Sequence, residues 1–452
     1  MRVENWSGRL AFILASIGAA VGLGNIWKFP YTLGSSGGSA FVLVYIGAIL
    51  LIATPIMMAE MIIGRRGRGS APTAVRTVAL DAGASKAWSG FGWMGLFAVF
   101  LVLSFYSVIA GWTLAYLLES VTGGLQGLSA AQVGQNFNEF LADPLPMLAW
   151  HLLFTAITVG IVSRGVRSGL EPVVKVLMPG LFLMLLGLVV YAAFAGEFAQ
   201  TLAYLFKPDF ALLTAPVVLA AVGQAFFSVN VGIGAVITYA AYLPANVNLF
   251  RSALTVSLGD TLVALLAGLA IFPIVFANNL DPGEGPGLVF VTLATAFASM
   301  PGGGVIGTLF FVMLLFAALT SAISMLEMTT ARTIESGRLS RPIAAAVLGS
   351  AACLVGVVTA LSFSVWSDVH LLGMFETFAG KTPFDLIDYL VSNVMLPLGG
   401  MGFVIFAGWC LQREVQVAEL GVGDSIWFDT WLFLARFVAP AAIALVFVFN
   451  LA

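Results

Sequence analysis

Long apolar segments separated by short polar ones dominate this sequence of 452 residues. A helix that crosses the hydrocarbon core of a bilayer needs about 20 predominantly apolar residues. Several segments are longer than that, which indicates tilted helices or helices that extend beyond the bilayer. The pattern predicts eleven membrane-spanning helices, at residues 9–33, 38–64, 88–120, 146–163, 170–192, 214–243, 248–277, 304–334, 341–361, 384–411 and 426–450.

The first segment contains residues that a simple membrane anchor does not need. Gly18, Gly22 and Gly24 interrupt its apolar run, and the polar Asn25 and the charged Lys28 follow them. Glycine permits unwound backbone, and unwound backbone inside hydrocarbon needs partners for its amide and carbonyl groups. A bound cation and a polar ligand would supply such partners, so this segment is the first candidate for a functional site.

The sixth segment is interrupted in a similar way. Gly232 and Gly234 follow shortly after Ser228 and Asn230. Segments 1 and 6 each open a group of five spans, and interrupted segments at corresponding positions of two halves indicate the central site of a transporter. A single glycine in a membrane helix is usually a packing residue. Two interruptions in register favour a binding site over packing.

Composition and charge support a membrane protein and give its orientation. Hydrophobic residues make up 60% of the chain and charged residues 9%, whereas an average soluble protein has about 25% charged residues. We therefore predict an all-α polytopic membrane protein in contact with a lipid bilayer, and nothing suggests nucleic acid as a partner. Fifteen of the 19 lysines and arginines lie on the side of the membrane that holds the N-terminus. The positive-inside rule places the N-terminus in the cytoplasm and the C-terminus outside.

The histidines and cysteines of the sequence are not arranged as catalytic or metal-binding groups. The two histidines, His151 and His370, stand alone, and the two cysteines, Cys353 and Cys410, lie in apolar runs. Neither pair offers a catalytic dyad or the spacing of metal ligands. We therefore expect no enzyme activity and no disulfide bond.

Several long motifs resemble the neurotransmitter:sodium symporter family of sodium-coupled amino-acid and amine transporters, in particular its bacterial members. The motifs cover nearly the whole chain and are Asn5 to Arg9, Gly22 to Pro30, Gly37 to Phe41, Gly223 to Phe227, Thr238 to Tyr242 and Leu319 to Ser321. The resemblance implies two five-helix repeats of inverted topology with broken helices 1 and 6, followed by one extra C-terminal helix. The implied boundaries are a cytoplasmic tail at 1–8, a first repeat at 9–192, an extracellular loop at 193–213, a second repeat at 214–411 and the eleventh helix at 426–452.

The resemblance also implies a function and a location. It identifies the protein as a sodium-coupled secondary active symporter of the bacterial plasma (inner) membrane that imports a neutral, hydrophobic amino acid by alternating access. Two other functions stay open: sodium-dependent transport of another small zwitterion or an amine, and amino-acid sensing without transport. The oligomeric state is not determined by the sequence.

Two sodium sites are implied by the resemblance. The first uses the Ala20 carbonyl, the side chains of Asn25, Ser228 and Asp260, and the carboxylate of the substrate. An acid inside a membrane span is costly and suggests function by default; its alternative is a carboxylate satisfied by a neighbouring helix. Family members with Asn at this position need chloride or a nearby acid, but Ala264 stands one turn along. We therefore expect Asp260 to supply the negative charge and transport to be independent of chloride.

The second implied sodium site combines backbone carbonyls with hydroxyl groups. Its carbonyls belong to Gly18, Val21 and Ala317, and its hydroxyls to Thr320 and Ser321. Oxygen ligands suit sodium because it is a hard cation, as calcium and magnesium are. The alternative is that both hydroxyls hydrogen-bond to the backbone of their own helix.

The implied substrate site uses the backbone that the broken helices free. Amides near Leu23 and Gly24 open a half-helix whose positive dipole end suits a carboxylate, and Tyr106 matches a family tyrosine that donates to the same carboxylate. Amine transporters of the family usually carry Asp where Gly22 stands, so an amino acid is favoured. The pocket is mainly apolar and has no charged side chain. Its residues are Ala20, Leu23, Gly24, Val102, Tyr106, Phe227, Ser228, Asn230, Ile233, Ser321, Ser324 and Met325.

Two gates are implied by the same resemblance. Lys28 and Asp388 match the outer pair that closes over the substrate, with Gln224 beside Lys28. Lysine acts as a point charge and gives a looser latch than the usual arginine. At the cytoplasmic side the matching residues are Trp6, Tyr242 and Glu335. The arginine that would pair with Glu335 is Arg2, one position before the expected place at Val3.

Three further residues have implied roles outside the binding sites. Glu60 is expected to cap the freed amides of span 6. Gly169 and Pro179 form a Gly-x9-Pro spacing in span 5. Proline removes a helical hydrogen bond and glycine permits unwinding, so this segment is expected to open a water path to the second sodium site. The alternative is an ordinary proline kink.

Overall fold

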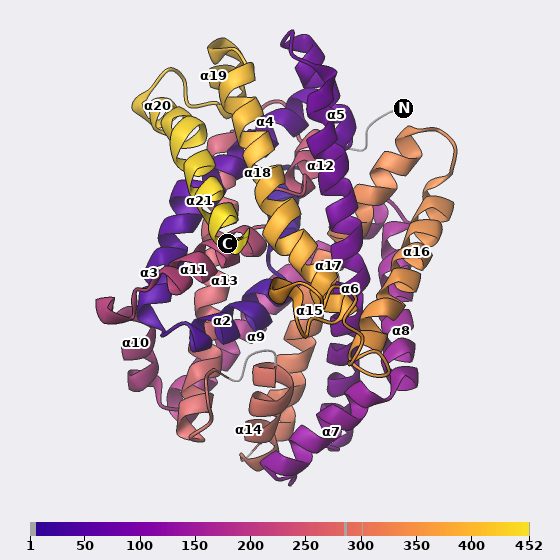
Figure 1. The fold of residues 1–452 in the computed structure, drawn as a ribbon, viewed down its shortest axis with the longest axis vertical. Coiled ribbons are helices and arrows are strands. Elements are labelled where there is room, and N and C mark those ends of the chain that lie inside the picture. The colour runs from indigo at the N-terminus through magenta and orange to yellow at the C-terminus, as the bar shows by residue number, and fades with distance from the viewer. Residues whose placement is uncertain (1–5, 284–286, 301, 452) are drawn as a thin grey trace.

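The computed structural model describes residues 6–283, 287–300 and 302–451, and within these ranges it contains helices and no strands. The helices form one bundle (Figure 1), in which α5 and α19 lie at one end and α7 and α14 at the other. The prediction of an all-α polytopic membrane protein is confirmed. We call these two ends the N-terminal end and the α7 end.

Nine helices in the described ranges are long and apolar enough to cross a membrane, and the bent pair of span 1 counts as a tenth. Span 6 is divided into two helices that are each too short to be counted by length, so eleven spans are consistent with the structure. Most predicted boundaries differ from the observed ones by a few residues. The spans are α1 (Arg9–Ala20), η1 (Gly24–Lys28) and α2 (Phe29–Ser35); α3 (Ser39–Ala48), η2 (Ile49–Ala53) and α4 (Thr54–Gly67); η3 (Lys86–Trp88) and α6 (Ser89–Thr122); α8 (Pro144–Val162); η4 (Val166–Leu170) and α9 (Glu171–Ala195); α11 (Ala215–Ser228) and α12 (Ala235–Ala241); α13 (Leu249–Ala277); α15 (Gly303–Glu335); α16 (Arg341–Ser362); α17 (Pro383–Tyr389), η8 (Leu390–Met395), α18 (Leu396–Ile405) and η9 (Phe406–Cys410); and α20 (Ile426–Phe433), η10 (Leu434–Val438) and α21 (Ala439–Leu451).

Spans 1 and 6 are both broken, as predicted. In span 1, α1 ends at Ala20, and the two halves of the span meet at an angle of 49°. In span 6, α11 ends at Ser228 and the helix resumes at Ala235. The gap holds Gly232 and Gly234 at φ angles of 92° and 76°, which a residue with a Cβ atom adopts only with strain.

Glu60 of α4 holds the break of span 6 in place. The backbone amide of Gly232 donates a hydrogen bond to Glu60 Oε1 at 2.6 Å, and the Glu60 side chain is fully buried. An unpaired amide in the membrane would cost several kcal/mol. The predicted capping role of Glu60 is therefore confirmed. The cysteines Cys353 and Cys410 are both free in this structure.

The segments between the spans contain further short helices. The capping box of Ser129 and Gln132 begins α7 and is visible in the sequence as Ser-x-x-Gln. Short amphipathic helices give a weak signal because their apolar face is narrow. The loop elements are α5 (Ala71–Asp81), α7 (Ala130–Ala142), α10 (Phe198–Phe206), η5 (Phe210–Leu212), η6 (Leu288–Leu293), α14 (Ala294–Ser299), η7 (Glu376–Phe378) and α19 (Arg413–Leu420).

Candidate functional site

A buried cluster of polar side chains lies between the two broken spans and α13. The Asn25 side-chain amide donates to Ser228 Oγ at 2.9 Å and to Asp260 Oδ1 at 2.8 Å. The Ser228 hydroxyl donates to Asp260 Oδ2 at 2.5 Å. All three side chains have an exposed fraction of 0%. The structure therefore brings together the three side chains that the sequence suggested for the first sodium site, and it places Ala20 at the buried end of α1.

Tyr45 of α3 joins this cluster, although the sequence did not suggest it. Its hydroxyl lies 2.9 Å from Ser228 Oγ, and its ring is fully buried. In the sequence, Tyr45 is a single hydroxyl-bearing side chain in the apolar span 2. Such a residue fits a packing role equally well.

Asp260 lacks a positively charged partner in the described part of the chain. None of the ion pairs found there includes this residue, and its hydrogen-bond partners Asn25 and Ser228 are neutral. A buried carboxylate without a counter-charge is costly. The cluster is also rich in oxygen atoms, the ligands that hard cations prefer. Its residues therefore fit a monovalent metal cation such as sodium.

A second set of oxygen atoms lies where α15 faces the break in span 1. Ser321 Oγ lies 3.4 Å from the carbonyl oxygen of Gly18 and 3.2 Å from that of Val21. Thr320 Oγ1 lies 3.0 Å from the Ala317 carbonyl oxygen. All five residues that the sequence suggested for the second sodium site are thus adjacent. The Thr320 contact stays within its own helix, whereas Ser321 reaches across to span 1.

Span 5 closes one side of this second oxygen set. A Cβ atom placed on Gly18 would lie 3.0 Å from Sδ of Met178, the residue before Pro179. In this structure Pro179 lies inside the continuous helix α9, and Gly169 lies in the π-helical turn η4 that precedes it. The segment with the Gly-x9-Pro spacing is therefore wound here.

The freed backbone of span 1 meets polar groups of α6 and α15. The Leu23 amide donates to the Tyr106 hydroxyl oxygen at 3.2 Å. A Cβ atom on Gly22 would lie 2.8 Å from that same hydroxyl and would also clash with Ser321 Oγ. The Ser324 hydroxyl donates to the Ser321 carbonyl at 2.8 Å. Gly22 therefore lets the broken backbone lie close to the Tyr106 and Ser321 hydroxyl groups, and together with the Leu23 amide these are the donors that a carboxylate needs.

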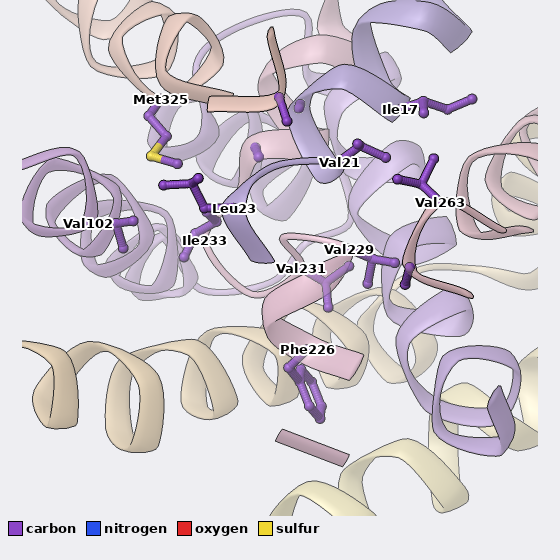
Figure 2. Close-up of a cluster of buried hydrophobic side chains, with 14 of the residues drawn as sticks. Ile17, Val21, Leu23, Val102, Phe226, Val229, Val231, Ile233, Val263 and Met325 are labelled. Atoms are coloured by element: carbon purple, nitrogen blue, oxygen red, sulfur yellow. The ribbon is translucent and has the colours of Figure 1, made fainter. Parts of the chain in front are cut away.

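Apolar side chains lie beside these polar groups on the α6 side. Figure 2 shows Val102, Met325, Leu23 and Ile233 gathered together, and all four have exposed fractions of 5% or less. Three other predicted site residues lie at the breaks. Gly24 would place a Cβ atom 3.1 Å from the Phe227 ring, and the Asn230 amide donates to the Ala19 carbonyl at 2.5 Å.

At the α7 side of the site, the predicted outer pair is not formed. The Lys28 ammonium lies 3.9 Å from the centroid of the Phe227 ring, and Asp388 accepts a hydrogen bond from Ser392 at 2.9 Å. Lys28, Gln224 and Phe227 line a cavity of about 420 Å³. Gln224 donates to the Gly24 carbonyl at 2.8 Å, so it holds the broken span beside Lys28.

At the N-terminal end, Trp6 covers the second half of span 6. Its indole Nε1 donates to the Tyr239 carbonyl at 3.2 Å, and its ring packs edge-on against Tyr242 at 6.2 Å. Glu335 accepts hydrogen bonds from Ser70 and, at 2.7 Å, from Thr73. The structure therefore joins Trp6 and Tyr242 but gives Glu335 other partners. Arg2 and Val3, which the sequence linked to Glu335, lie outside the described residues.

Tyr242 instead contacts an ion pair that sequence analysis missed. Its hydroxyl donates to Glu327 Oε1 at 3.1 Å, and Arg341 Nη1 lies 2.6 Å from Glu327 Oε2. Glu327 is fully buried in α15. An acid in the apolar run of span 8 was a usable signal, because charged residues inside membrane helices are rare unless they are paired or functional.

Arg341→Met is expected to destabilise the protein strongly. The substitution removes the guanidinium that lies 2.6 Å from the buried Glu327 carboxylate, and breaking a buried pair in this way costs about 3–5 kcal/mol. Thermal unfolding in detergent measures the effect. The double variant Glu327→Gln/Arg341→Met removes both charges and should recover most of the loss. A single variant as stable as the native protein would contradict the importance of this pair.

Known proteins resemble this chain along nearly its whole length. A sequence model of the sodium:neurotransmitter symporter family matches residues 3–140 and 138–452. The chain is 41% identical to the uncharacterised sodium-dependent transporter YhdH of Bacillus subtilis over 98% of this chain and 96% of that protein. It is 32% identical to an uncharacterised sodium-dependent transporter of Haemophilus influenzae, over 99% and 98%. The crystal structure of MhsT in complex with L-phenylalanine superposes with a TM-score of 0.91 at 43% identity and covers 98% of this chain and 99% of MhsT.

Proposed function

Because this chain belongs to the sodium:neurotransmitter symporter family, and is a sodium-dependent membrane transporter rather than an enzyme, we propose that it imports a neutral, hydrophobic amino acid together with sodium. The observation that carries this proposal is the fully buried Asp260 carboxylate at the two helix breaks. A bound cation would stabilise this buried charge, and the unwound backbone next to it has amide and carbonyl groups that a polar ligand can bind.

Two sodium ions are the proposed co-substrates. The first binds among Ala20, Asn25, Ser228 and Asp260, and the Asp260 carboxylate supplies the negative charge. Chloride is therefore not required. The second binds where Ser321 faces the carbonyls of span 1. Sodium in these positions ties the halves of the broken spans together.

An amino acid is supported by the chemistry around Gly22. The Leu23 amide, the Tyr106 hydroxyl and the half-helix dipole suit a carboxylate, and the apolar side chains around them suit a hydrophobic side chain. MhsT, whose solved structure contains L-phenylalanine, shares the fold at 43% identity. An amine without a carboxylate would leave the Leu23 amide and the Tyr106 hydroxyl without their proposed ligand.

Alternating access is supported by the difference between the two sides of the site. On the α7 side a cavity lies beside Lys28 and Gln224, and Lys28 and Asp388 form no ion pair with each other. Trp6 and Tyr242 cover the N-terminal side, and α9 is wound across the second sodium site. We propose that formation of the outer pair, followed by unwinding near Gly169 and movement of Trp6, exposes the site to the cytoplasm. The N-terminus is then cytoplasmic in the bacterial inner membrane.

Ion replacement in proteoliposomes tests this function. Uptake of the radiolabelled amino acid that gives the largest thermal shift among the twenty is expected to fall to background when potassium replaces sodium, because the buried Asp260 then lacks the cation that fits its site. Replacing chloride with gluconate is expected to leave uptake unchanged. The measurement is the initial rate of uptake into sealed vesicles.

Each outcome separates the candidate functions. Undiminished uptake in potassium would contradict sodium coupling, and a large loss in gluconate would contradict chloride independence. Sodium-dependent binding without uptake would favour a sensor. A response to amines but to none of the twenty amino acids would move the substrate to the amine class.

A further inference from the structure

Two adjoining cavities at the N-terminal end form a groove that the transport site does not use. The first has a volume of about 640 Å³ and lies between α6, α15 and α16; it is lined by Trp93, Phe97 and Leu348, among others. The second has a volume of about 610 Å³ and lies between α5 and the start of α6. Trp93 and Arg332 line both cavities. We call the pair the α5–α6 groove.

The two halves of the groove differ in chemistry. Aromatic and aliphatic side chains of α6 line the larger half, and Trp93 and Phe97 have exposed fractions of 50% and 55%. Because these residues lie in a membrane span, their exposed faces meet lipid. Arg76 and Lys86 line the smaller half, and both are exposed. The groove is therefore apolar along the span and basic at its N-terminal end.

The positive charge of the groove is only partly balanced. Arg332 lies 3.9 Å from Glu335, the acid that contacts it, and Glu335 already accepts hydrogen bonds from Ser70 and Thr73. The Arg332 guanidinium lies 4.8 Å from the Trp93 ring centroid, and its buried Nε has no hydrogen-bond partner among the described residues. Arg332 lines both cavities and its ion pair with Glu335 is long, so its guanidinium can bind an anion at the junction of the two cavities.

We propose that the α5–α6 groove binds an anionic phospholipid, with its phosphate-containing headgroup between Arg76, Lys86 and Arg332 and an acyl chain along Trp93 and Phe97. The positive charge of the basic half complements an anionic headgroup. The apolar half has a volume of about 640 Å³, which is large enough for an acyl chain. A soluble anion would leave the apolar cavity unfilled. A zwitterionic lipid would bring its own cation next to the arginines. Basic clusters at the cytoplasmic surface attract anionic lipids by this physics.

Quenching of Trp93 fluorescence by brominated lipids tests the proposal. The protein is placed in bilayers that contain equal fractions of dibrominated phosphatidylglycerol or dibrominated phosphatidylcholine. The difference between the native protein and the Trp93→Phe variant isolates Trp93 from the other tryptophans. We expect the anionic lipid to quench Trp93 more strongly at the same mole fraction.

Charge variants assign that preference to the groove. Arg76→Gln/Lys86→Gln should lower the preference for the anionic lipid by about fivefold for each side chain removed. Arg251→Gln is the matched control, since Arg251 is exposed at the start of α13 and lines neither cavity. It should leave the preference unchanged. Monodisperse elution and unaltered thermal unfolding would show that the variants are folded.

Three results would overturn the proposal. The first is equal quenching by the two lipids in the native protein. The second is a preference that survives the double charge variant or is lost equally in Arg251→Gln. The third is stabilisation against thermal unfolding by soluble glycerol phosphate equal to that by phosphatidylglycerol at the same concentration, which would identify a phosphate ester without acyl chains as the occupant. The transport proposal is independent of these outcomes, because none of the groove residues lies in the sodium or amino-acid site.

Discussion

Asp260→Asn is expected to abolish sodium-coupled uptake. The native carboxylate is fully buried, and the part of the chain that the structure describes offers it neutral hydrogen-bond partners and no ion pair. Asparagine preserves the size of the side chain but removes the charge that would balance a bound cation. Removing one member of a buried charge pair costs about 3–5 kcal/mol, which corresponds to roughly a 150- to 4,000-fold loss of sodium affinity.

A sodium titration of amino-acid binding in detergent measures this effect, together with uptake in proteoliposomes. Glu119→Gln provides a control, because Glu119 is an acid of another membrane span, in the last turn of α6. It should retain native sodium affinity. An Asp260→Asn protein with native sodium dependence would show that another group balances the cation. The variant should remain folded, because the native site must itself tolerate a buried charge.

Gly22→Ala is expected to prevent amino-acid binding. The added methyl group would lie 2.8 Å from the Tyr106 hydroxyl and would clash with Ser321 Oγ. It would push these two hydroxyl groups away from the broken backbone, where the substrate carboxylate is proposed to bind. Overpacking of this kind costs about 1–3 kcal/mol, which corresponds to roughly a 5- to 150-fold loss of affinity. Loss of the bound carboxylate would increase the effect.

Gly47→Ala is the matched control for this substitution. Gly47 also lies in an apolar span, but a Cβ atom placed there meets nothing within 4 Å. Alanine is the better helix former, so this variant should bind the amino acid normally. Equilibrium binding of the radiolabelled amino acid at saturating sodium compares the two. Native affinity in Gly22→Ala would place the carboxylate elsewhere.

The structural neighbours of Asp260 show how far sequence analysis reaches. A carboxylate in an apolar run is conspicuous because burying a charge is costly, so its importance is visible without a structure. Asn25 and Ser228 are also visible, since each lies beside a glycine interruption. Tyr45 is not, although its hydroxyl lies 2.9 Å from Ser228 Oγ. A lone hydroxyl in a membrane helix can bond within its own helix or across to another, and only packing decides which.

At the two gates, too, the sequence identifies candidate residues but does not determine which of them are in contact. The sequence pointed to Lys28 and Asp388, but their separation here depends on how the spans are arranged. Trp6 meets Tyr242 as suggested. Tyr242, however, binds Glu327. Glu327 and Glu335, the acid that the sequence suggested, both lie on α15. The register of α12 against α15 determines which of the two the Tyr242 hydroxyl can reach.

The sequence by itself determined the membrane class, the approximate limits of the spans and the two helix breaks. These features depend on local chemistry: apolar length, glycine conformation and the cost of isolated polar groups in hydrocarbon. Only the tertiary structure decided which polar groups meet, that span 5 is wound against Gly18 through Met178, and that Arg76 and Arg332 border one groove. Those contacts join residues far apart in the chain, and their partners are set by side-chain packing between helices, to which local sequence patterns carry no signal.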